Sequence, residues 1–171
     1  MPPDRVAPEF TRLLPLGLVG PEGREEVLEA APAEREALAR RFGIPAIGSL
    51  RAKLRLVPER DGTVVARGTL SASVTQTCVV TLEPVEQQVE EEVALRFLPA
   101  GREPDEGPEE IDEIEAVGGV ADLGEAVAEQ LSLALDPYPR APGAALPEIG
   151  EGNGSAEGPF AGLAALRRRS G

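Results

Sequence analysis

The chain has 171 residues, 42% hydrophobic and 3% aromatic, which is enough for one small core built mainly from aliphatic side chains. No apolar run is long enough to cross a bilayer, so we expect no membrane association. Thirty acidic and 17 basic residues give a formal net charge of −13, which repels nucleic acid overall and attracts basic partners. The first residues lack the pattern of a signal or transit peptide, and a single cysteine cannot form an internal disulfide. We therefore expect the protein in the cytoplasm.

The first part of the chain predicts one helix and little regular structure before it. Proline is frequent in residues 1–20, so residues 13–16 predict an edge strand at most. Residues 27–30 predict a short strand. Residues 32–42 predict a helix, because proline stands at its first position, two arginines lie near its end and Gly43 follows.

The middle of the chain alternates apolar and polar residues and predicts three antiparallel strands, over residues 50–57, 63–77 and 85–97. The Asp61-Gly62 pair predicts a hairpin turn between the first two strands. Residues 99–115 are rich in acids, glycine and proline and predict a mobile loop. Asp122 and Glu125 then predict the start of a helix that ends before Pro137 and covers the sheet.

These elements predict an α+β fold: an antiparallel, strongly twisted β-sheet or partly open barrel covered by two helices, with a flexible C-terminal tail. We expect one domain over residues 9–140. Residues 141–171 predict a flexible linker followed by a short amphipathic basic motif.

The sequence lacks the combinations of residues that usual catalytic and metal sites require. The chain has no histidine, its one cysteine has no base beside it, and no nucleophile elbow, phosphate loop or zinc set is found. The sequence therefore predicts a protein that is not an enzyme and has no cofactor or metal. Cys78 ends the long strand with the parity of the inward residues, so we expect a buried structural side chain, with a reactive or ligand role as the alternative.

One sheet face is predicted to be basic, because Arg51, Lys53 and Arg55 alternate outward on one strand and Arg67 on its hairpin partner. Two interpretations remain open. These cations pair with Glu90 and Glu92 on the third strand, or they contact RNA phosphates beside a column of Ser and Thr hydroxyls.

The last residues combine an apolar stripe at helical spacing with an arginine run: Phe160, Leu163, Leu166, Arg167, Arg168 and Arg169. This motif is a solubilising end, a segment that folds back on the core, or a tethered motif that docks on a partner.

Three segments together resemble the YceD-like proteins, a family named for large ribosomal RNA subunit accumulation. They are residues 29–43, residues 76–84 with Gln-Thr-Cys-Val-Val-Thr-Leu-Glu-Pro, and residues 130–140, which end in Pro-Tyr-Pro-Arg. The basic C-terminal end is similar to that of the single-cysteine branch. Many relatives have a second cysteine where Thr81 stands, and another near the end of the domain.

The resemblance implies a non-enzymatic bacterial ribosome-biogenesis factor that supports the accumulation, processing or stability of large-subunit ribosomal RNA. Its expected partners are that RNA or basic ribosomal proteins, and not DNA. A metal-binding or redox regulator centred on Cys78 and an RNA-processing enzyme are the alternatives. The candidate contact residues are Arg51, Lys53, Arg55, Arg67 and Arg140, and the candidate structural residues are Cys78, Pro84, Asp122 and Tyr138.

Overall fold

The computed structural model describes residues 9–103 and 111–145. In chain order the elements are β1 (Leu13–Pro15), the 3-10 turn η1 (Leu16–Leu18), β2 (Arg24–Glu29), α1 (Pro32–Phe42), β3 (Ala46–Pro58), β4 (Val64–Thr77), β5 (Pro84–Leu98), β6 (Asp112–Glu115), the 3-10 turn η2 (Val117–Gly119), β7 (Val120–Asp122) and α2 (Leu123–Ala134).

The strands form two sheets. The larger has the order β2-β3-β4-β5-β6, and the smaller pairs β1 with β7. Every pair is antiparallel except β5 with β6, which is parallel. The predicted α+β fold with two helices is confirmed, and the sheet is not a closed barrel. No helix among the described residues has the length and hydropathy needed to cross a membrane.

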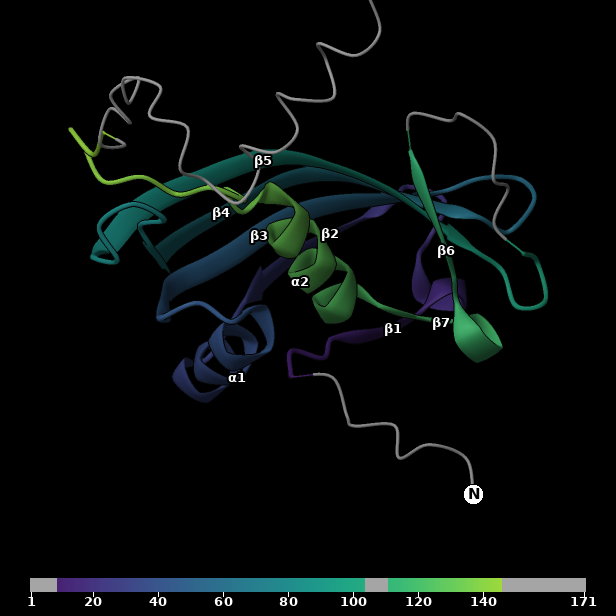
Figure 1. The fold of residues 1–171 in the computed structure, drawn as a ribbon. Coiled ribbons are helices and arrows are strands. Elements are labelled where there is room, and N and C mark those ends of the chain that lie inside the picture. Colours follow the sequence, from purple (N-terminus) through teal and green to yellow (C-terminus); the bar gives the residue numbers. More distant parts are fainter. Residues whose placement is uncertain (1–8, 104–110, 146–171) are drawn as a thin grey trace, which may run out of the picture.

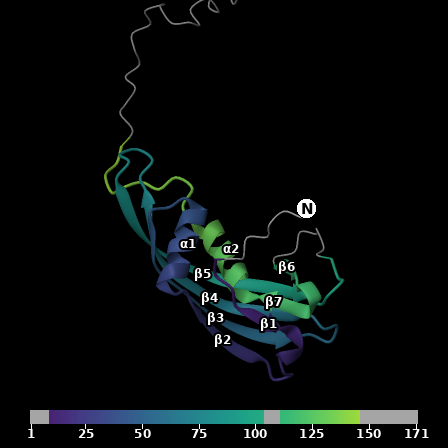
Figure 2. The same ribbon diagram turned by 90° about the horizontal axis from the view of Figure 1, so that it is seen from below.

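The large sheet arches over the helices, so that α1, α2 and the β1–β7 pair all lie on its concave side (Figures 1 and 2). Side chains alternate along β3, β4 and β5, and one parity faces the helices. The largest fully buried side chains come from this layer: Phe10, Leu38, Leu50, Leu56, Leu70, Leu95, Phe97, Leu98 and Leu131. The opposite parity forms an outer face that no element covers within the described residues.

The two helices begin and end where their sequences predict. Pro32 opens α1, Glu34 accepts the N–H of Ala31 at 2.7 Å, and Gly43 ends the helix with a left-handed φ of 66°. Asp122 caps α2 by accepting the N–H groups of Gly124 and Glu125. The same carboxylate accepts the N–H of Arg12 at 2.8 Å and so attaches the N-terminal segment to α2.

Two arginines join the helices to the rest of the concave layer. Arg41 at the end of α1 binds Glu125 of α2 with both guanidinium nitrogens, at 2.7 and 2.9 Å. Arg12 binds Glu34 of α1 in the same two-pronged manner, at 2.7 and 2.9 Å. Such paired hydrogen bonds fix orientation as well as proximity, so they set the positions of both helices against the sheet.

The loop predicted over residues 99–115 is shorter in the structure, and the prediction is wrong for Asp112–Glu115, which form β6. Two contacts explain this. Ile114 packs against the core, and the Glu113 carboxylate, whose side chain is only 10% exposed, binds Arg96 at 3.2 Å. An acidic segment can thus join a sheet when a neighbouring strand supplies a cation. Residues 104–110 and 146–171 lie outside the described residues.

Candidate nucleic-acid interface

The outer face of the sheet brings together four of the five predicted contact residues. Arg51, Lys53 and Arg55 alternate along β3, all exposed, and the register places Arg67 of β4 directly opposite Arg55. Arg140, the fifth, is separate: it lies next to Pro139, whose carbonyl accepts the N–H of Val79 at the far end of the β4–β5 hairpin.

Acidic side chains flank this basic row on both sides. On β2, Glu25 lies opposite Arg55 and Glu29 opposite Arg51. On β5, Glu90 and Glu92 lie opposite Ser71 and Thr69, one strand further away. The pairing of the row with Glu90 and Glu92, one of the two interpretations, is not formed among the described residues. β4 separates the cations of β3 from β5, and Arg67 of β4 lies opposite Ala94 instead of either glutamate.

Most of the row has no ionic partner. Arg55 lies 3.8 Å from Glu25, but Arg51, Lys53 and Arg67 make no ion pair with any described residue. Two like charges directly opposite each other on neighbouring strands, as Arg55 and Arg67 are, destabilise a sheet unless an anion lies between them.

Two shallow hollows lie over the row and share Arg55 and Arg67. One, of about 360 Å³, is bounded by β2, β3 and β4 and includes Val27, Lys53 and Thr69. The other, of about 280 Å³, has Val57 and Val65 in its floor and Arg96 at its margin. Sequence reasoning missed Arg96, although its outward parity on β5 could have indicated it. Its position next to the row becomes clear only from the register, which places it opposite Val65.

Hydroxyl groups continue the surface along β4 through Thr69, Ser71, Ser73 and Thr75. The Ser73 hydroxyl lies 3.0 Å from that of Ser49 on β3. Guanidinium, ammonium and hydroxyl groups in this arrangement can bind phosphate oxygens along a strand, and such contacts position a nucleic acid without reading its bases.

Cys78 lies away from this face, in the turn between β4 and β5, and is fully buried as predicted. Its sulfur accepts the N–H groups of Val80 and Thr81 at 3.4 Å and of Ala141 at 3.2 Å. Hydrogen bonding from the Thr81 side chain, followed by the Ala141 N–H, lowers the pKa of the thiol to about 6. Among the described residues no group of three or more His, Cys, Asp or Glu side chains could hold a metal ion.

The other predicted structural residues differ in their surroundings. Asp122 caps α2, as described above. Pro84 begins β5 opposite Thr77. Tyr138 is 72% exposed, and its backbone N–H donates to the Asp136 carboxylate at 2.8 Å. The candidate tail motif, from Phe160 to Arg169, lies outside the described residues.

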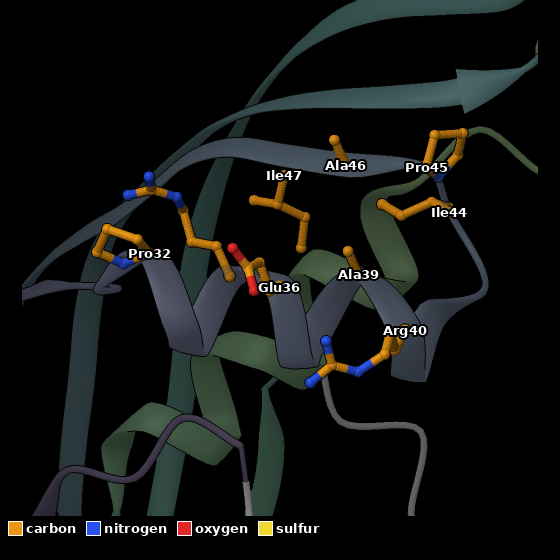
Figure 3. A pocket seen from close by; sticks show the side chains of 9 residues that line it. Pro32, Glu36, Ala39, Arg40, Ile44, Pro45, Ala46 and Ile47 are labelled. Carbon is orange, nitrogen blue, oxygen red and sulfur yellow. The ribbon is translucent and has the colours of Figure 1, made fainter.

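A further hollow of about 320 Å³ lies on the helix side, between α1 and the start of β3 (Figure 3). Its walls are apolar side chains such as Ala39, Ile44 and Ile47, and Glu36 and Arg40 lie along its helical rim (Figure 3). Arg35, which also lines it, donates to the Ala30 carbonyl at 3.0 Å. The described lining contains neither a thiol nor a hydroxyl, and its one carboxylate is that of Glu36.

The described residues form an α+β fold whose large sheet is arched, with the helices on one side and an uncovered row of cations on the other (Figure 1). The chain belongs to the YceD family: the family described as "Large ribosomal RNA subunit accumulation protein YceD" matches residues 66–167. This confirms the resemblance seen in the sequence. A comparison with curated proteins finds no match, and a comparison with solved structures finds none either.

The family description names an effect on ribosomal RNA accumulation and no chemical reaction. The matched residues include Arg67, Cys78 and Asp122, whereas Arg51, Lys53 and Arg55 precede them. Membership therefore implies a role in the accumulation of large-subunit ribosomal RNA, and the means by which the chain achieves this follows only from its own surfaces.

Proposed function

We propose that this protein supports the accumulation of large-subunit ribosomal RNA as a non-enzymatic cytoplasmic factor, by contacting the RNA backbone through the outer face of its sheet. The observation that carries the proposal is the Arg55–Arg67 pair. The Cα atoms of these two residues are partners on neighbouring strands. The Arg55 guanidinium donates to the Glu22 carbonyl and lies 3.8 Å from Glu25, whereas Arg67 has no ionic partner among the described residues. In a chain with a net charge of −13, a cation without a partner beside a second cation favours an anionic ligand.

The flanking acids indicate which kind of RNA fits. Neighbouring strands are about 4.8 Å apart, so the acidic column on β2 lies about 4.8 Å from β3 and the one on β5 about 9.6 Å from it. These distances are comparable to the Debye length of about 8 Å, so both columns influence a ligand over the row. A single RNA strand along β3 and β4 places its phosphates over cations and hydroxyls. A duplex is wider and also places phosphates near Glu29 and Glu90. We therefore expect single-stranded or looped RNA to bind more tightly than a duplex.

The test is RNA binding by the double variant Lys53→Gln/Arg67→Gln, with single-stranded and duplex fragments of large-subunit ribosomal RNA as probes. The matched control is Arg35→Gln/Arg40→Gln, which removes the same charge from α1, on the concave side of the sheet (Figure 1). We expect the test variant to lose about tenfold in affinity. The slope of the logarithm of the binding constant against the logarithm of the salt concentration should also become shallower, by about one unit or slightly more, because two phosphate contacts disappear.

Thermal unfolding separates this outcome from a folding defect. Removing one member of a like-charged cross-strand pair should leave the free energy of unfolding unchanged or raise it by up to about 1 kcal/mol. Equal affinity losses in the test and control variants, or unchanged association of both with large-subunit precursor particles in sucrose gradients, would remove this face from RNA binding.

A further inference from the structure

Another hollow lies on the concave side of the sheet, where α2, β7, β1 and β6 meet. It has a volume of about 410 Å³. Leu13, Ile114, Val117, Val120 and Ala126 make its lining predominantly apolar. Two of these side chains are strongly exposed, Leu13 by 65% and Val117 by 66%. We call this hollow the α2 groove.

Carboxylates surround the α2 groove. Glu115, Asp122, Glu125 and Glu129 all line it, and no lysine or arginine does. Asp122 is occupied as the cap of α2, and Glu125 is bound to Arg41. Glu115 and Glu129 make no ion pair with any described residue. An apolar floor with two available carboxylates at its margin is complementary to a segment that carries aliphatic side chains on one side and cations beside them.

The chain's own basic motif at Phe160–Arg169 has this character, but the distance argues against it as the occupant. The described chain ends at Ala145, close to Ala141 and therefore to Cys78 at one end of the β4–β5 hairpin. The α2 groove lies at the opposite end, where Ile114 pairs with Phe97. From Pro84 to Phe97, β5 spans up to about 43 Å.

Residues 146–159 would have to cover this span. Fourteen residues reach about 46–50 Å only when fully extended, and a flexible chain of that length has a mean end-to-end distance of about 20 Å. Docking within one molecule would thus require almost complete extension of the linker. An occupant from a separate molecule carries no such cost.

We infer that the α2 groove docks a basic amphipathic segment of a partner protein. This goes beyond the proposed function, because the groove lies on the concave side of the sheet. The proposed RNA contacts are on its outer face, which we call the RNA face. Aliphatic side chains of the partner lie between Leu13 and Val117, and its lysines or arginines meet Glu115 and Glu129. One molecule can then hold ribosomal RNA on its outer face and a basic protein segment on its concave side.

The probe for this inference is a synthetic peptide of about 14 residues, long enough to form a helix, with leucine and lysine at amphipathic spacing. Its binding to the full-length protein is measured by fluorescence anisotropy. The comparison peptides have the same composition in an order that removes the amphipathic spacing, or glutamate in place of lysine. We expect the amphipathic basic peptide to bind at least about tenfold more tightly than either.

Two double variants test the location, and each has a matched control. Glu115→Lys/Glu129→Lys should weaken peptide binding about tenfold, whereas Glu36→Lys/Glu86→Lys, with the same change in net charge, should not. Leu13→Ser/Val117→Ser should weaken it similarly, whereas Val79→Ser/Leu133→Ser, at two exposed apolar side chains that do not line the groove, should not. Equal losses in variant and control, or no loss in either groove variant, would overturn the inference.

Two further results would assign the groove to a different occupant and would therefore also overturn the inference. If the full-length variant Phe160→Ser/Leu163→Ser/Leu166→Ser binds the peptide more tightly than the unmodified chain, the chain's own motif competes for the groove. If the protein sediments as a dimer that Val117→Ser dissociates, a second copy occupies it. The RNA-face variant Lys53→Gln/Arg67→Gln should bind the peptide normally.

Discussion

Cys78 is buried, but its surroundings are polar rather than apolar. Three backbone N–H groups converge on its sulfur, two from its own turn and one from Ala141, which follows α2 by several residues. The sulfur therefore connects the β4–β5 turn to the segment after α2. Thr81, which stands where many relatives have a second cysteine, contributes the hydrogen bond with the largest effect on the thiol.

The low pKa of Cys78 predicts a particular dependence of stability on pH. The pKa is about 6 in the folded protein, below the ordinary thiol value of about 8.5. Between these values the unfolded chain binds a proton that the folded chain does not, so stability rises with pH. The stabilisation is complete above about pH 8.5 and is lost as the pH falls through about 6. The absence of histidine leaves this window free of other side chains with an ordinary pKa inside it.

The measurement is urea unfolding of the unmodified protein and of Cys78→Ala at several pH values between about 5.5 and about 9, so that the series extends about half a unit beyond each end of the window. The difference in unfolding free energy between the two should grow with pH. Cys78→Ser, which keeps an acceptor for the three N–H groups, should be less destabilised than Cys78→Ala. A difference that stays constant over this range would mean that the thiol titrates normally in the folded state.

Asp122 is the second residue whose side chain has several simultaneous roles. It caps α2 and also accepts the N–H of Arg12, which leads into β1. Asp122→Ala should therefore lower the free energy of unfolding by about 1–2 kcal/mol, at the upper end of the cost of losing a cap. Asp122→Asn, which retains an acceptor oxygen, should lose clearly less in chemical denaturation. Equal losses would show that the charge, and not the hydrogen bonds, matters here.

At the scale of elements, Gly68 determines how closely β3 and β4 approach each other. It stands opposite Leu54, and a Cβ atom added to it would lie 1.8 Å from the Lys53 carbonyl oxygen. Both atoms nearest to it belong to backbone, so the strands themselves would have to separate. A glycine at this position permits this close approach of β3 and β4 beneath the outer face.

Gly68→Ala should consequently destabilise the protein by about 1–3 kcal/mol or more, as overpacking does. Gly17→Ala is the control, because a Cβ there meets nothing within 4 Å. Thermal unfolding of the two variants gives the comparison. If Gly68→Ala were as stable as Gly17→Ala, β3 and β4 could not be as close as described.

The long elements were predictable because each carries its signal locally. Pro32 and Gly43 mark the limits of α1, and strict alternation marks β3, β4 and β5. Two of the short strands, β6 and β7, were not. β6 and β7 have only four and three residues, too few to show a period, and each depends on a distant partner: Phe97 for Ile114, and Leu14 for Ala121.

The candidate site was predictable only in part for the same reason. Outward parity indicated Arg51, Lys53, Arg55 and Arg67 without a structure. The neighbours of that row depend on strand register, which places Glu25 and Glu29 beside it and Glu90 and Glu92 one strand away. The α2 groove, which combines β1, β6, β7 and α2, could not be recognised before the short strands were known.

For the whole molecule, the net charge of −13 does not show how charge is distributed between the two sides of the sheet. The cationic row occupies the outer face of the sheet, and the acidic α2 groove lies on the concave side. The sheet and its core separate the two, so a ligand on one side has no contact with a ligand on the other. We therefore expect the effects of variants on the two faces to be additive.

The last prediction concerns the C-terminal motif, which we propose to dock on a partner rather than on its own domain. Residues 141–159 are rich in proline, glycine and alanine, a linker composition with few bulky side chains that could pack. Deleting the chain from Gly158 onward should therefore change the melting temperature by less than about 2 °C. The same deletion should reduce co-sedimentation with large-subunit precursor particles, because Phe160, Leu163 and Leu166 can no longer contact a partner.

The full-length variant Phe160→Ser/Leu163→Ser/Leu166→Ser separates the apolar contacts from the charge of Arg167, Arg168 and Arg169. If it loses co-sedimentation as the deletion does, the apolar stripe is responsible; if it does not, the arginines hold the partner through charge alone. A fall in melting temperature of more than about 4 °C on deletion corresponds to at least roughly 1 kcal/mol in a chain of this size. That result would contradict docking on a partner, because a segment whose removal unfolds its own domain must pack against it.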